Sequence, residues 1–336
     1  MRDLNPPLKA RVQQLLDLEY ADHDTLKQLV NTIIDDDTDY EHVITFLDNA
    51  PSLIHRQFAD NLRQIFEEVL RQRLLEVRQD LDRNPIDLYT ALFDFHKVEN
   101  NREHLKGILT TNYDSYVEEA LQAAHFESVY MGFDLGLPNP TPSQESITVL
   151  KLHGSFDWQD TWPIEVGSGE PPLWIPPGIQ KDKQRYPFNA IWAIAREVLA
   201  CDILRIIGCR LDGNDWDLIS LLFSTIHVQS SYRPYQVEII DSPQNAKVMA
   251  ETLPYLQPHS MLEIDEIGRQ LVSEWGGGAP QDFSTLNSEK QAQLITHAGS
   301  SHNWFEVWLR QKAELLYSDL GSLDTTAGAI RAFLEQ

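Results

Sequence analysis

The stretch that decides the fold is Gly107-Ile108-Leu109-Thr110-Thr111-Asn112-Tyr113-Asp114, in which a short apolar run gives way to polar residues. A second stretch, Ile147-Thr148-Val149-Leu150-Lys151-Leu152-His153-Gly154-Ser155, follows the same pattern. Each apolar run has the length and the residue types of a buried parallel strand. Polar residues after such a strand lie at its carboxyl end, where open α/β sheets bind ligands. The two stretches therefore predict one polar site at the edge of a parallel sheet.

Two further apolar runs, over 202–208 and 236–241, predict a third and a fourth strand. Apolar residues at helical spacing over 113–124, 189–200 and 215–226 predict helices that alternate with these strands. Strands that alternate with helices form right-handed crossovers and a parallel sheet covered on both faces. We therefore expect a three-layer α/β fold with a parallel sheet.

The rest of the chain reads as helical. Helical spacing upstream of residue 107 predicts a helical layer over residues 1–106, and the α/β core is expected over 107–275. The glycine-rich stretch 276–280 separates this core from a helical C-terminal tail, 281–336. The Pro-, Gly- and Trp-rich segment 160–187 is expected to be a long loop and a candidate lid. The predicted outer helices cover 8–18, 24–34, 58–82, 288–298, 304–317 and 325–334.

Charge and composition narrow the class of protein. The 336 residues include 51 acidic and 27 basic side chains, which gives a net charge of -24. Such a surface repels phosphate backbones, so we expect no direct nucleic-acid binding. No apolar run approaches the ~20 residues of a membrane helix, and no secretory signal is visible, so we expect a cytoplasmic protein without membrane contact. The two cysteines, Cys201 and Cys209, are too few for a four-thiolate zinc site, and we expect no metal.

The residue types at the strand ends carry possible chemistry. An asparagine amide donates and accepts hydrogen bonds at once, and a histidine titrates near neutral pH, so Asn112 and His153 suit proton-transfer chemistry. A structural role is the alternative for each position. Asn112 would then shape a strand-to-helix turn, Asp114 would cap the following helix, and His153 would be a buried, hydrogen-bonded histidine.

At these strand ends the chain resembles the sirtuin (silent information regulator) family, in particular its bacterial zinc-free branch of NAD-hydrolysing defence proteins. The family's Gln-Asn-hydrophobic-Asp motif corresponds to Thr111-Asn112-Tyr113-Asp114, and its Leu-His-Gly motif to Leu152-His153-Gly154. The family's Gly-Thr-Ser loop falls on Gly208-Cys209-Arg210, and its strand-end Ile-Asn pair on Ile240-Asp241. The resemblance implies a Rossmann-like fold over roughly residues 106–245.

The resemblance also implies roles for individual residues. Asn112 and His153 correspond to the catalytic pair that cleaves NAD to nicotinamide and ADP-ribose. NAD, which is the substrate, would be bound by a set of residues at the same strand ends. This set comprises Thr111, Asp114, Gly154, Ser155, Gly208 and Asp241.

Two departures from the family pattern open an alternative. The chain contains no Gly-Ala-Gly-x-Ser loop, whose backbone N–H groups hold the pyrophosphate in the family. We therefore expect weak or absent NAD binding by the isolated chain, whether the loop is truncated or naturally lost. A catalytically inactive sirtuin-like scaffold or assembly module is the alternative to an NAD hydrolase. A protein deacylase is disfavoured, because such sirtuins usually carry four zinc-binding cysteines.

The resemblance further implies partners. Proteins of this branch act in anti-phage defence with an ATPase motor, an Argonaute or a nucleotide sensor, and they oligomerise through added helices. In the tail, Trp304, Trp308 and Leu315 share one predicted helix face. That face either folds back on the sheet or anchors a homo-oligomer, and the sequence leaves both open.

Overall fold

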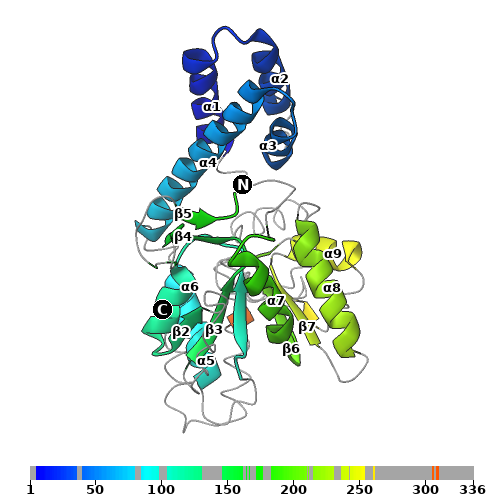
Figure 1. Cartoon of the computed structure of the whole chain (residues 1–336). Helices are drawn as coiled ribbons and strands as arrows, with labels where there is room; N and C mark the ends of the chain where they lie inside the picture. The colour runs from blue at the N-terminus through cyan, green and yellow to red at the C-terminus, as the bar shows by residue number, and fades with distance from the viewer. Residues whose placement is uncertain are drawn as a thin grey trace, which may run out of the picture. The chain divides into compact units, whose positions relative to one another are not determined.

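The computed structural model of the chain is shown in Figure 1. It divides into two compact units. The first unit comprises residues 1–84, 111–114 and 151–189, and the second comprises 85–110, 115–150 and 190–336. The domain boundaries expected near residues 106 and 280 stay predictions. The structure describes residues 5–35, 40–79, 85–97, 104–130, 146–161, 164, 166, 172–176, 183–209, 211, 215–230, 236–241, 243–253, 260–261, 305 and 308–309.

Four helices begin the first unit: α1 (Asn5–Glu19), α2 (Asp24–Asp35), α3 (Tyr40–Asp48) and α4 (Leu53–Gln79). The helices predicted over 8–18 and 24–34 are confirmed, and the third predicted helix is confirmed from residue 58 to residue 79. Helix α3 was not predicted. It follows the acidic run at residues 35–37 and has only nine residues, so its apolar periodicity is short.

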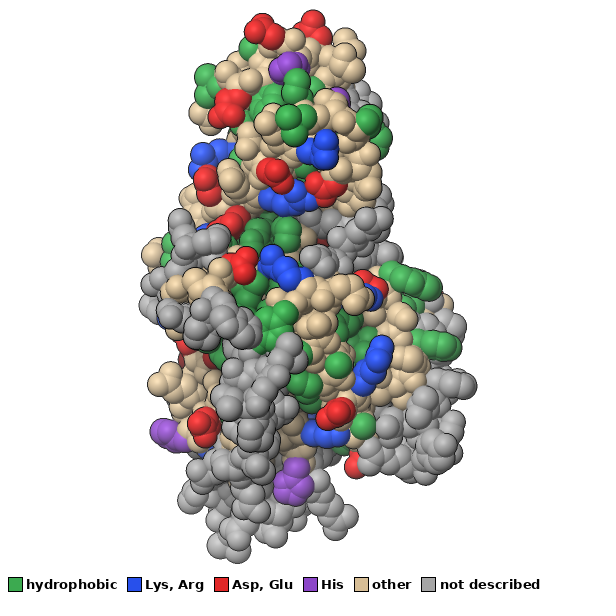
Figure 2. All heavy atoms as spheres, viewed as in Figure 1, with side chains coloured by type: hydrophobic (Ala, Val, Ile, Leu, Met, Phe, Trp, Pro, Cys, Tyr) green, Lys and Arg blue, Asp and Glu red, His purple; other side chains and the backbone are tan. Residues whose placement is uncertain are grey.

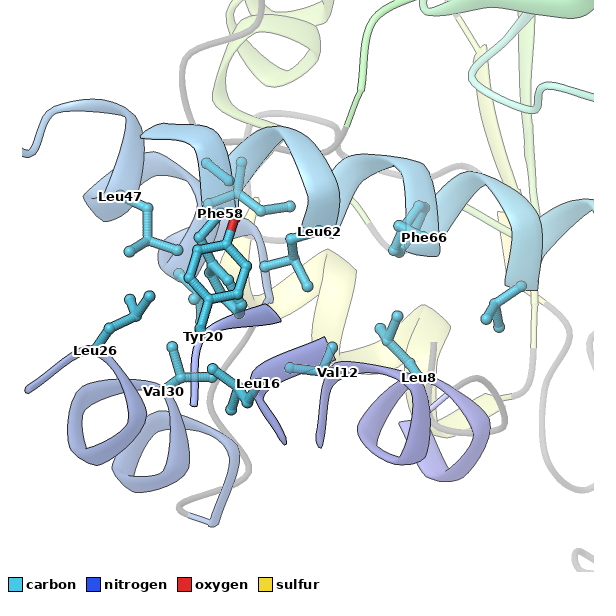
Figure 3. Close-up of a cluster of buried hydrophobic side chains, with 14 of the residues drawn as sticks. Leu8, Val12, Leu16, Tyr20, Leu26, Val30, Leu47, Phe58, Leu62 and Phe66 are labelled. Carbon is cyan, nitrogen blue, oxygen red and sulfur yellow. The ribbon is translucent and has the colours of Figure 1, made fainter. Parts of the chain in front are cut away.

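The helices of the first unit enclose a core of their own (Figure 3). Leu8, Val12 and Leu16 recur at four-residue spacing along α1, and all three are at most 2% exposed. This spacing places them on one helix face, which packs against α4. Phe58 and Leu62 supply the facing side chains from α4, and the ring of Tyr20 meets the edge of Phe58 at 5.1 Å. The apolar faces of short helices are thus buried against one long helix.

The first unit also contains a two-stranded antiparallel sheet. Strands β4 (Gly154–Gln159) and β5 (Pro172–Trp174) pair with Gly154 opposite Trp174. Part of the expected 160–187 loop is therefore strand. Helix α4 is tied to this sheet because the Arg71 guanidinium lies 4.5 Å from the centre of the Phe156 ring.

In its described residues, the second unit contains two three-stranded sheets. One has the order β1 (Gly107–Thr110), β3 (Ser146–Lys151), β2 (Glu127–Tyr130), and β2 runs parallel to β3. The other has the order β6 (Ile203–Ile207), β7 (Gln236–Ile240), β8 (Ser260–Met261), and all its pairs are parallel. All four predicted strands are confirmed, as β1, β3, β6 and β7.

The described residues also contain helices that lie before and between these strands along the chain. They are α5 (Pro85–Lys97), α6 (Tyr116–Ala123), α7 (Phe188–Val198), α8 (Trp216–Ser230) and α9 (Pro243–Thr252). The three predicted inner helices correspond to α6, α7 and α8. Parallel strands that alternate with helices, after a helical N-terminal region, confirm the α/β fold class.

The core of the second unit includes three residues of the C-terminal tail. Phe305, Trp308 and Leu309 are at most 4% exposed and belong to the cluster that also buries Val149 and Ile240. Their spacing of three and four places them on one face of a helical turn. The remainder of the predicted tail helices lies outside the described residues. These three side chains therefore pack within the unit.

Charges of both signs are mixed over the helices of the first unit, as the face in Figure 2 shows. Arg11 pairs with Glu68 at 3.2 Å, and Arg71 pairs with Glu67 at 2.8 Å.

Within the described part of the chain, no helix combines the length and the apolar character that crossing a membrane requires.

Candidate functional site

The polar segment after β1 is held against the segment after β3. The carbonyl oxygen of Tyr113 accepts hydrogen bonds from the Ser155 hydroxyl at 3.0 Å and from the Phe156 N–H at 3.1 Å. The Lys151 ammonium donates to the carbonyl oxygen of Asp114. The carboxyl ends of β1 and β3 therefore meet at one edge of the sheet, and residues 111–114 lie beside residues 151–156.

A second set of bonds fixes β5 to the same place. The Tyr113 hydroxyl donates to the carbonyl oxygen of Ile175 at 3.1 Å. The N–H of Ile175 donates to the carbonyl oxygen of His153 at 2.8 Å. Because backbone and side-chain bonds converge on these residues, the position of each segment depends on the other two.

Aromatic rings surround Tyr113. Its ring stacks on Phe156 at 5.2 Å between centroids and meets the edge of Trp174 at 5.1 Å. The ring of His153 lies 6.5 Å from that of Tyr113, with an angle of 34° between the planes. Such packing is typical of a rigid support, and it joins the candidate site to the core of the first unit.

The two residues expected to act differ in exposure. Asn112 is exposed, whereas His153 is only 5% exposed. An exposed amide next to a fixed backbone can reach a ligand from solution, and it can both donate and accept. The burial of His153 means that its substitution also removes packing. His153 is therefore less separable from the fold than a loop residue would be.

Gly154 follows His153 and has a backbone that only glycine adopts readily. Its φ is +79°, in the left-handed region. A β-carbon at this position would lie 2.4 Å from the carbonyl oxygen of Leu173 and 2.8 Å from the α-carbon of Trp174. The glycine thus permits close approach of β5 immediately after His153.

A second pair of predicted site residues lies in the second unit. The N–H of Gly208 donates to the carbonyl oxygen of Ile240 at 3.0 Å, so the carboxyl ends of β6 and β7 are joined. Asp241 follows Ile240, is 3% exposed, and accepts a bond from the Asn245 amide at 3.0 Å. Gly208 is itself exposed and has a φ of 61°. The structure therefore brings Gly208 and Asp241 to neighbouring strand ends.

The predicted residues thus form two groups, each within its own unit. Thr111, Asn112 and Asp114 lie with His153, Gly154 and Ser155 in the first unit, and Gly208 and Asp241 lie in the second. Arg210 lies outside the described residues. Cys201 and Cys209 are both half-buried thiols.

Sequence reasoning missed Lys151, Tyr113 and Asn245 as parts of these groups. Lys151 interrupts an otherwise apolar strand, and a charged residue in such a run is a signal for a buried partner. Tyr113 and Asn245 give no comparable signal, because their partners are known only from the fold.

The fold and the site together define a class of protein. It is an α/β protein in which a loop that carries an asparagine is held beside a histidine, at the carboxyl ends of two strands. Within the chain, residues 106–246 match the family model of the SIR2-like domain. This match covers every predicted site residue and supports the resemblance to sirtuins. No curated protein matches the chain. SIR2-like domains generally bind NAD as a substrate, so the match indicates an NAD-related function.

Proposed function

We propose that this chain cleaves the bond between nicotinamide and ribose in NAD, and releases nicotinamide and ADP-ribose. The observation that carries the proposal is the clamp between residues 111–114 and 151–156. It holds Asn112 and His153 on adjacent segments inside the region that matches the SIR2-like domain.

The proposed step is a hydrolysis. Nicotinamide leaves with the electrons of its bond to ribose, which creates oxocarbenium character at the ribose carbon, as in glycoside hydrolysis. The Asn112 amide positions a water molecule, whose oxygen forms the new bond to that carbon. His153 takes the proton that the water loses, and general-base assistance of this kind typically contributes about 10²–10⁴-fold in rate.

The other predicted residues would bind the substrate. The Asp114 carboxylate would accept from the nicotinamide carboxamide, and Thr111, Gly154 and Ser155 would line the same end of the sheet. The resemblance assigns Gly208 and Asp241, which lie together within the second unit, to phosphate and adenosine ribose. Asp241 is buried and accepts a bond from Asn245 at one carboxylate oxygen, and a carboxylate keeps further acceptor sites for a ligand hydroxyl.

The second candidate is a scaffold without catalysis, and one observation favours it. The chain contains no Gly-Ala-Gly-x-Ser stretch. Without those backbone donors the pyrophosphate loses charge-assisted hydrogen bonds, each worth about 1.5–3 kcal/mol. The sheet would then keep its polar strand ends but bind no NAD, and the protein would act only as a scaffold in the assembly of a complex.

The wider setting of either function is also part of the proposal. We infer a component of a bacterial anti-phage system that acts in the cytoplasm, forms a homo-oligomer and works with an ATPase motor, an Argonaute or a nucleotide sensor. Its support is the resemblance to the zinc-free sirtuin branch and the acidic surface, which suits a protein partner better than nucleic acid.

Product analysis in ¹⁸O-labelled water tests the hydrolysis. The full chain is incubated with NAD at millimolar concentration, alone and with an acetylated peptide. Hydrolysis predicts equimolar nicotinamide and ADP-ribose, with one ¹⁸O in the ribose product, and no need for the peptide. Release that requires the peptide would identify a deacylase, and no release under either condition would favour the scaffold.

A further inference from the structure

Lys151 is a fully buried cation beside the candidate site. It ends strand β3, and its side chain is 0% exposed. Removal of an ammonium group from water is costly unless hydrogen bonds replace the lost hydration. A buried lysine at a strand end therefore needs acceptors that the fold provides.

One acceptor of this ammonium lies in the segment that carries Asn112. The Lys151 ammonium donates to the carbonyl oxygen of Asp114, 37 residues earlier in the chain. The neighbouring carbonyl oxygen, that of Tyr113, accepts hydrogen bonds from Ser155 and Phe156, which follow His153 in the chain, whereas Lys151 precedes it. Bonds from residues 151, 155 and 156 thus reach two successive carbonyls of one short segment.

We propose that Lys151 is a positioning residue: its buried ammonium fixes the backbone of residues 112–114 beside His153, and so sets where the Asn112 amide lies. The catalytic part of this inference rests on the proposed NAD cleavage. The structural part, an ordering of the 112–114 backbone by Lys151, stands without it.

The chemistry of the group suits this task. An ammonium offers three donors and no acceptor, so it suits a place where oxygen acceptors gather, such as the carbonyl groups at the end of this loop. A charge-assisted bond to a carbonyl is stronger than a neutral one. Asn112 is exposed, and the bonds to the carbonyl oxygens of Tyr113 and Asp114 order the backbone that carries it. A shift of about 1 Å in a positioning group can slow a reaction roughly 10²-fold.

Lys151→Met tests the inference, with Lys106→Met as the matched control. Methionine is an unbranched, flexible side chain close to lysine in length, and it removes the ammonium donor. The Lys106 ammonium also donates to backbone carbonyls, those of Glu197 and Ala200, each at 2.6 Å. The control therefore removes the same kind of bond at a different place.

The first measurement is hydrogen exchange in the full chain, on a peptide that includes residues 111–115. We expect the amides of this segment to exchange at least about tenfold faster in Lys151→Met than in the wild type and in Lys106→Met. Equal exchange in all three proteins would overturn the inference. If Lys151→Met does not fold, the same measurement on Lys151→Leu, which also lacks a donor, decides between the same two outcomes.

The second measurement is nicotinamide release, in a double-mutant cycle with Asn112→Ala. We expect Lys151→Met to lower kcat by about 10–100-fold with little change in KM, and to add no further loss to Asn112→Ala. Additive losses would mean that Lys151 does not act through Asn112. A wild-type chain that releases no nicotinamide contradicts the proposed function, while the exchange measurement still decides the role of Lys151.

Discussion

Substitution of Gly154 by alanine is expected to damage the hairpin that supports His153. The residue has a φ of +79°, and its missing side chain leaves room for β5. An added β-carbon would meet the carbonyl oxygen of Leu173 at 2.4 Å, far inside van der Waals contact. Because the atom that it meets belongs to backbone, no side-chain rotation relieves the clash.

Two terms set the size of the effect. A left-handed backbone costs a non-glycine residue about 1–2 kcal/mol. Overpacking of a tight site costs a further 1–3 kcal/mol, roughly. We therefore expect Gly154→Ala to lower the free energy of unfolding by about 2–5 kcal/mol, which is a large part of the 5–15 kcal/mol typical of a domain.

Denaturant unfolding followed by tryptophan fluorescence measures this loss, because Trp158 and Trp174 lie on the two strands of the hairpin. Gly208→Ala is the control, since Gly208 also has a positive φ of 61° but is exposed. Gly208→Ala should lower the free energy of unfolding only by the cost of a left-handed backbone, about 1–2 kcal/mol. A Gly154→Ala protein as stable as the wild type, to within about 0.5 kcal/mol, would refute the steric argument.

Three further predictions follow from the site and from the second unit. Titration calorimetry of residues 1–336 should detect only weak NAD binding or none, because the loss of two charge-assisted bonds weakens affinity by roughly 10²-fold or more; low-micromolar affinity would contradict this. Burial raises the pKa of the Asp94 carboxyl, an effect that nearby Lys97 and His125 partly offset. The folded chain therefore binds this proton more tightly than the unfolded chain does. The contribution of Asp94 to the free energy of unfolding therefore falls as the pH rises above the ordinary carboxyl pKa of about 4. Asp94→Asn should accordingly have a higher melting temperature than the wild type at pH 7, and this difference should disappear at low pH. An equal difference in melting temperature at pH 3 and pH 7 would mean that packing, and not the charge of Asp94, causes it. Trp308→Ala should destabilise the second unit by about 3–5 kcal/mol, because the ring is buried in its core, and an unchanged melting temperature would show that the tail packs elsewhere.

The strands that carry the site could be predicted from sequence, whereas the sheet that supports it could not. Strands β1, β3, β6 and β7 are apolar runs that end in polar residues, and this contrast is visible in the chain. Strand β4 was missed although Phe156 and Trp158 alternate with the half-buried Asp157 and Gln159. Its partner β5 has three residues within a proline-rich segment, too few for a periodic signal.

The contacts of the site depend on residues far apart in the chain. Both Asn112 and His153 were identified at strand ends, but the bond from Lys151 to Asp114 spans 37 residues. Nothing local to either residue specifies the other. The burial of His153 and the pairing of Asp241 with Asn245 likewise depend on packing that only the folded chain provides.

The rate of nicotinamide release by the full chain and by Asn112→Ala tests the central claim most directly. Asn49→Ala is the matched control, because Asn49 is also an exposed asparagine of the first unit and directly follows α3. The proposed hydrolysis predicts release by the wild type and by Asn49→Ala, and a loss of at least about 10²-fold in Asn112→Ala at unchanged melting temperature. Release by Asn112→Ala at the wild-type rate would contradict the account.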